Sequence, residues 1–88
     1  MTLSQKVLNR IEASHRITDH YRPGGHNTCG LTHYKIDDRL TVVYLHNGCD
    51  SVRILVDGIE ANIIDRDTVM SAIEDRKEKI KRALIESL

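Results

Sequence analysis

The sequence predicts an α+β domain in which an N-terminal helix, a four-stranded antiparallel meander sheet and a long C-terminal helix follow one another. Two observations support this fold class. β-rich runs separated by turn signals fill the middle of the chain, and apolar residues recur at helical spacing near both ends. With 88 residues, the chain has the length of one small domain, which we assign to residues 1–88.

The first helix is expected over about residues 3 to 16. Thr2 and Gln5 match a capping box, and apolar residues from Leu3 to Ile11 then lie on one helical stripe. The following segment, residues 17–30, contains Pro23 and a Gly-Gly pair and is expected to be irregular. Chemistry, if the chain has any, is expected there, because long loops in compact domains are often functional.

The firmest turn signal is Asp57-Gly58, because this pair supplies the positive φ angles of a type I′ hairpin turn. With Val56 opposite Ile59, one face of the hairpin is entirely apolar. The residues expected on this core face are Val52, Ile54, Val56, Ile59, Ala61 and Ile63, joined by Thr41, Val43 and Leu45 of the preceding strand.

The preceding hairpin is expected to turn at residues 47–50, with a loop of two or four residues. Either length places Leu40, Val42 and Tyr44 on the reverse face of the sheet together with Leu55. A loop of three residues would exchange the two faces. With a loop of two or four residues, the reverse face is too apolar to remain bare without a binding role.

The first strand of the meander is expected at residues 31–36, with a turn at Asp37-Asp38. A two-residue turn there would set Lys35 opposite Leu40. Extending that ladder would set Cys29 opposite His46.

The last helix is expected over about residues 67–88, capped by Asp65 or Asp67. Such a helix would measure roughly 33 Å, against about 20 Å for the strands, so its end should extend past the sheet. Ile85 and Leu88 would then need a cover from another copy of the chain or from a different protein.

Charge and composition restrict the kind of partner. Thirteen basic residues balance thirteen acidic ones, which argues against a general polyanion binder, so nucleic acid is not expected as a direct ligand. Two cysteines, no membrane-spanning run and no signal-peptide pattern predict a cytoplasmic protein that has no membrane partner. A disulfide between Cys29 and Cys49 stays open as a minor alternative.

A zinc site is one candidate, with His26, Cys29 and His46 as ligands. Imidazole and thiolate are the ligands that zinc favours, and His20, His33 and Cys49 are further candidates. The chain contains no CxxC pattern, so scattered surface histidines without a metal are the default expectation.

The sequence therefore favours a non-catalytic protein-interaction module, such as an inhibitor or regulator that binds a larger macromolecular partner, with a homodimer as a further option. Compact inhibitors that mobile elements use against host enzymes share this size and neutrality, although no residue supports that comparison. No catalytic residue is assigned. The expected partner-binding residues are Leu40, Val42, Tyr44, Leu55, Ile85 and Leu88.

The alternative is a small metal- or histidine-dependent phosphodiesterase or nuclease built on residues 15–46. Two histidines would serve as general base and acid, while Arg16, Arg22 and Lys35 would hold the phosphate.

Overall fold

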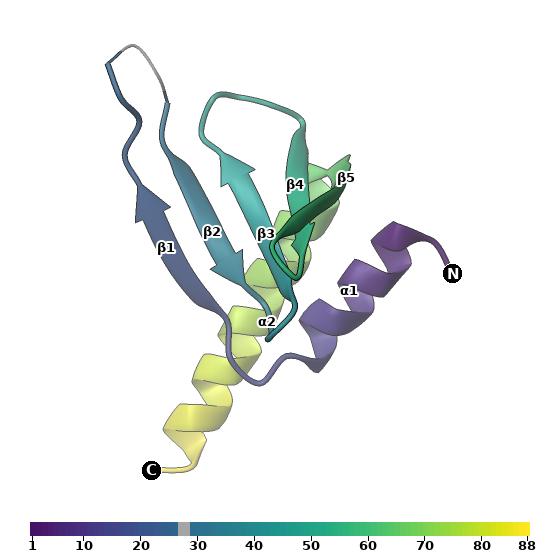
Figure 1. The fold of residues 1–88 in the computed structure, drawn as a ribbon. Helices are drawn as coiled ribbons and strands as arrows, with labels where there is room; N and C mark the ends of the chain where they lie inside the picture. The colour runs from purple at the N-terminus through teal and green to yellow at the C-terminus, as the bar shows by residue number, and fades with distance from the viewer. Residues whose placement is uncertain (27–28) are drawn as a thin grey trace.

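The structure is a computed structural model that describes residues 1–26 and 29–88, except for the side chains of residues 62 and 63. It confirms the α+β class, with a helix at each end of an antiparallel sheet (Figure 1). The sheet has five strands in the order β1-β2-β3-β4-β5. The elements are α1 (Leu3–Ala13), β1 (Thr18–Arg22), β2 (Leu31–Lys35), β3 (Leu40–Leu45), β4 (Ser51–Val56), β5 (Ile59–Asp65) and α2 (Arg66–Glu86).

Local capping signals fix where both helices begin, as predicted. The Thr2 hydroxyl accepts from the backbone N–H of Gln5 at 3.2 Å, and the Gln5 side chain accepts from the backbone N–H of Thr2 at 3.0 Å. This reciprocal pair is the capping box expected for α1. At α2, the Asp65 carboxylate accepts from the backbone N–H of Thr68 at 2.9 Å.

The strand that the sequence did not predict is β1. It occupies part of the segment that was expected to be irregular, and it pairs with β2 from Thr18 opposite Lys35 to Arg22 opposite Leu31. All five of its residues are exposed, because it is an edge strand that the helices do not cover. Such a strand shows no alternation of apolar and polar residues, which is why its sequence gave no strand signal.

The two middle turns differ from the expected lengths, and this exchanges the faces of the sheet. Three residues, Asp37 to Arg39, separate Ile36 from Leu40, whose backbone groups are hydrogen-bonded. Lys35 therefore pairs with Thr41 and not with Leu40. Five residues connect β3 to β4, and Val42 pairs with Ile54. Because side chains alternate with a period of two, an odd loop length moves every β3 side chain to the other face.

The β4–β5 turn matches its prediction at the turn and departs from it further along. Asp57 and Gly58 have φ angles of 55° and 81°, as a type I′ turn requires, and Val56 pairs with Ile59. A bulge follows between Ile54 and Leu55, so Val52 pairs with Ile64.

Two of the core positions expected on β5 are therefore wrong. Ile59 is 72% exposed and Ala61 is exposed, while Ile64 is buried. The core position expected for Ile63 falls on a side chain outside the described part of the chain.

The core lies between the sheet and both helices, which cover the same face of the sheet (Figure 1). Leu40 and Val42, expected on the bare reverse face, are 2% and 0% exposed inside this core, so that assignment was wrong. Their neighbours are the buried residues Val7, Ile11, Ile36, Val52, Ile54, Ile64, Val69 and Ile73.

The opposite side of the sheet, which we call the open face, has no described helix over it. It carries the even-numbered residues of β1 and the odd-numbered residues of β2, β3 and β4. Val43 lies at its centre between His33 and Arg53, and it is buried without belonging to the main core. Leu55 was predicted on the reverse side of the sheet, and it lies on the open face. Its neighbour there is Thr41 and not Leu40.

Two leucines of β3 test which face is covered. Leu40 is fully buried under the helices, whereas Leu45 is half-buried on the open face. We expect Leu40→Ala to lower the free energy of unfolding by about 3 kcal/mol and Leu45→Ala by about 1 kcal/mol. Urea unfolding of both variants measures this difference. A larger loss for Leu45→Ala would contradict the observed register.

Candidate functional site

The C-terminal half of α2 is the most exposed apolar part of the molecule. The helix has 21 residues and a length of about 32 Å, so it is longer than the strands that it crosses. Figure 1 shows it running behind the sheet and continuing past its lower edge to the C-terminus. Leu84, Ile85 and Leu88 are 65%, 57% and 103% exposed. Ile85 and Leu88 are thus exposed at the end of the helix that extends past the sheet, and their role in binding a partner stays a prediction.

A groove of about 560 Å³ lies between this end of α2 and the residues that lead into β1. Ile17 comes from the β1 side, and Ile80, Leu84 and Ile85 come from α2. Arg16, Thr18, Lys77 and Lys81 complete the lining. We call this surface the α2 groove. The sequence indicated its α2 side, but it did not indicate the side formed by residues 16–18, because β1 was not predicted.

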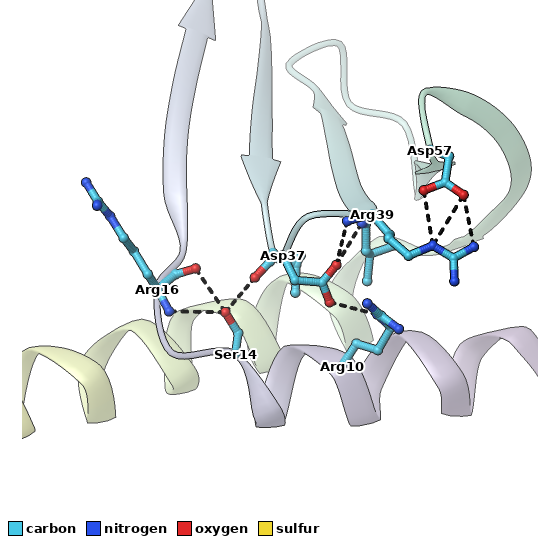
Figure 2. Close-up of polar contacts among 8 residues, drawn as sticks. Arg10, Ser14, Arg16, Asp37, Arg39 and Asp57 are labelled. Carbon is cyan, nitrogen blue, oxygen red and sulfur yellow. Dashed lines mark hydrogen bonds and ion pairs between the residues drawn. The ribbon is translucent and has the colours of Figure 1, made fainter.

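Polar contacts hold the two sides of the groove together. Arg76 donates through Nε to the backbone oxygen of Ser14 at 2.8 Å, and Lys77 Nζ lies 2.6 Å from Asp19 Oδ2. The Ser14 hydroxyl in turn donates to the Ile36 oxygen at 2.6 Å (Figure 2). These contacts join α2, the end of α1 and the sheet at the level of residues 76 and 77. Every residue from 81 onward is exposed.

A charged pair fixes α1 against the turn between β2 and β3. Arg10 Nε lies 2.7 Å from Asp37 Oδ2, while Asp37 Oδ1 accepts from the backbone N–H groups of Arg39 and Leu40 at 2.9 Å each (Figure 2). The hydrogen bond from Arg10 lowers the pKa of Asp37 to about 2, with the two backbone donors adding to the effect against the opposing effect of burial.

The predicted zinc ligands are not brought together. His26, Cys29 and His46 are all exposed, and the part of the chain that the structure describes holds no group of three His, Cys, Asp or Glu side chains able to bind one metal ion. The backbone N–H of His46 donates to the oxygen of Gly30, so Cys29 is not opposite His46 as expected. Both Cys29 and Cys49 are free.

His46 belongs instead to an aromatic cluster on the helix side of the sheet. Its ring lies edge-on to Tyr21 and Tyr44, with centroid distances of 5.4 and 4.6 Å, and its Nε2 is 2.8 Å from the Thr32 hydroxyl. Tyr44, expected on the bare reverse face, is therefore half-buried on the covered side. Gly30 leaves room for this cluster, because a Cβ atom there would collide with the Tyr21 ring.

Two histidines that were only loose candidates in the sequence become direct neighbours. His20 pairs with His33 across β1 and β2 on the open face. Arg22 and Lys35 lie on the same face. Each is two residues from the histidine of its own strand, and because the strands are antiparallel they lie on opposite sides of the histidine pair. Side chains directly opposite each other in an antiparallel pair have Cβ atoms about 4.5–5.5 Å apart. The pairing depends on β1, so no signal in the local sequence could have revealed it.

Comparisons with protein-family models, with curated protein sequences and with solved structures find no match to this chain. Judged over the described residues, neither helix combines the length and the apolarity needed to cross a membrane. The functional argument therefore depends on the geometry of the chain itself.

The Arg10–Asp37 pair should make stability depend on pH. Asp37→Asn keeps the Oδ1 acceptor for both backbone donors and removes the charge that Arg10 faces. We expect a loss of about 1 kcal/mol at pH 7, reduced from the full value of the pKa shift because Arg10 is half-exposed to solvent.

The depressed pKa of Asp37 sets the sign of this effect. The contribution is fully present above the unfolded-state pKa, near 4, and is lost as the pH falls toward about 2. Urea unfolding at pH 7 and at pH 2 measures it, with the exposed neighbour Asp38→Asn as the matched control. A deficit of equal size at both pH values would show that the ion pair does not cause it.

Proposed function

We propose that this chain is a non-catalytic interaction module, acting as an inhibitor or regulator, that binds an acidic and partly apolar segment of a larger protein in the α2 groove. The observation that supports this most directly is the exposure of Leu84, Ile85 and Leu88 at the end of α2. Large aliphatic side chains gathered on one surface favour burial against a partner.

Charge around the groove supports an acidic partner segment. The lining includes Arg16, Lys77 and Lys81, and none of its eight residues is acidic. Asp19 neutralises Lys77, which leaves Arg16 and Lys81 as cations at the edge of an apolar floor. A segment with aliphatic residues on one side and carboxylates beside them complements this arrangement.

The chemistry of the lining supports binding and not catalysis. The groove offers aliphatic groups, two ammonium groups, one guanidinium and one hydroxyl. A general base or nucleophile that works near neutral pH normally comes from His, Cys, Asp or Glu, and none of these lines the groove.

The matched variants are Leu84→Asp, Ile85→Asp and, as the control, Ile59→Asp. Ile59 is 72% exposed at the distant β4–β5 turn, so it tests the general effect of replacing an exposed aliphatic residue by a carboxylate. A partner captured by the wild-type chain is purified and mixed with each variant, and the dissociation constant is measured by calorimetry. We expect each groove variant to bind at least tenfold more weakly and Ile59→Asp to bind as the wild type does.

Salt and size measurements complete this test. Binding to an acidic segment should weaken as the salt concentration rises. Equal binding by the groove variants, or equal weakening by Ile59→Asp, would refute the assignment. A wild-type dimer that dissociates on Leu84→Asp, seen by light scattering, would assign the groove to a second copy of the chain instead.

The phosphodiesterase alternative is favoured by one observation, the placement of His20 opposite His33 with Arg22 and Lys35 on the same face. Two imidazoles side by side on a flat sheet are poorly placed to act on opposite sides of one phosphorus atom. Hydrolysis of bis(4-nitrophenyl) phosphate by the purified chain, lost in both His20→Ala and His33→Ala, would support catalysis over simple binding.

A further inference from the structure

Four basic side chains lie on the open face over β1 and β2, where His20 is opposite His33 and Arg22 and Lys35 lie two residues from that pair in opposite directions. His20 and Arg22 come from β1, and His33 and Lys35 come from β2. We call these four residues the β1–β2 cationic cluster. His20, Arg22 and Lys35 are exposed and His33 is half-buried, so all four groups are accessible from the same side of the sheet.

Asp37 and Asp38 line a pocket with Lys35, but Asp37 is bound to Arg10, and neither carboxylate forms an ion pair with a member of the cluster among the described residues. Arg53 on the same face is 3.7 Å from Glu60, so its charge is already partnered. Asp19, the acidic residue of β1, faces the helix side and binds Lys77. Neither Arg22 nor Lys35 has an ion-pair partner in the described part of the chain. The cluster therefore concentrates like charges whose mutual repulsion an anion would relieve.

The surroundings of His33 make its protonation respond to such an anion. Burial lowers the pKa of His33, and the positive charges of Arg22 and His20 lower it further. Lys35 is the remaining charged group near it on β2, and the facing residues of β3 are Thr41, Val43 and Leu45, none of which titrates. A bound anion would oppose the effect of the positive charges and raise the pKa of His33, so an anion whose own charge does not change with pH should bind more strongly as the pH falls.

We propose that the β1–β2 cationic cluster is a binding site for a phosphate dianion, as carried by a phosphate monoester. A tetrahedral dianion presents several acceptor oxygens, which suits a site where two opposed imidazoles are flanked on either side by the long side chains of Arg22 and Lys35. This inference concerns a different face from the α2 groove and does not depend on the docking proposal.

The shape of the cluster favours a single phosphate over a nucleic-acid strand. The positive groups cover only β1 and β2, and the next strand presents Thr41, Val43 and Leu45. A strand of nucleic acid is normally bound by an extended basic track with aromatic side chains for stacking. All three tyrosines of this chain lie on the helix side of the sheet, so the open face offers no stacking platform.

The test is a titration of the full chain with inorganic phosphate at constant ionic strength, followed by nuclear magnetic resonance of the five imidazoles. We expect saturable shifts at His20 and His33 only and an upward shift of the pKa of His33 with phosphate. Sulfate, which stays a dianion over this range, should bind more tightly at pH 6 than at pH 8. Arg22→Gln and Lys35→Gln should each weaken binding about tenfold, the effect of losing one charge-assisted hydrogen bond.

Arg53→Gln is the matched control, because it removes a cation from the same face that already has a partner. Phosphate affinity should be unchanged in this variant. If His15, His26 and His46 shift as much as His20 and His33, the effect is general screening and the proposal is overturned. It is also overturned if a single-stranded oligonucleotide binds more tightly than phosphate and depends equally on Arg53. Unchanged amide spectra in each variant establish that the fold is intact.

Discussion

The structure depends on one constraint: a single face of the sheet receives both helices. Val7 and Ile11 of α1 and Val69 and Ile73 of α2 all enter the same core. A chain of this size has no other described helix with which to cover the opposite side. The side chains on the covered face therefore become the core, and those on the open face remain available to solvent or to a ligand.

The position of α2 on that face explains how a protein of 88 residues can present two separate surfaces. Arg76 and Lys77 tie the helix to Ser14 and Asp19, Ile80 is still half-buried, and every residue from 81 onward is exposed. These last turns have no sheet beneath them, which leaves their aliphatic residues exposed beside Ile17. The cationic cluster lies on the other side of the same sheet. A ligand at one surface would thus leave the other accessible.

The candidate sites were predictable to different degrees. Ile85 and Leu88 could be predicted as exposed, because comparing the length of a helix with that of a strand needs only residue counts. Leu40 and Val42 were assigned to the wrong face, since one residue of turn length reverses every side chain of a strand. The proposed zinc ligands are not grouped among the described residues, for a related reason. His26 and Cys29 lie between β1 and β2, and spacing along a connecting segment does not determine distance in space.

The sequence alone determined the features that neighbouring residues control. Thr2 with Gln5 and Asp65 set the helix starts, and Asp57-Gly58 set the β4–β5 turn through its positive φ angles. Only the tertiary structure decided the face on which Val42 packs and the meeting of His20 with His33. Caps and tight turns are decided by hydrogen bonds over a few residues. Register and edge-strand pairing are decided by which arrangement of the whole sheet buries the most aliphatic surface. The buried surface is contributed by residues far apart in the chain.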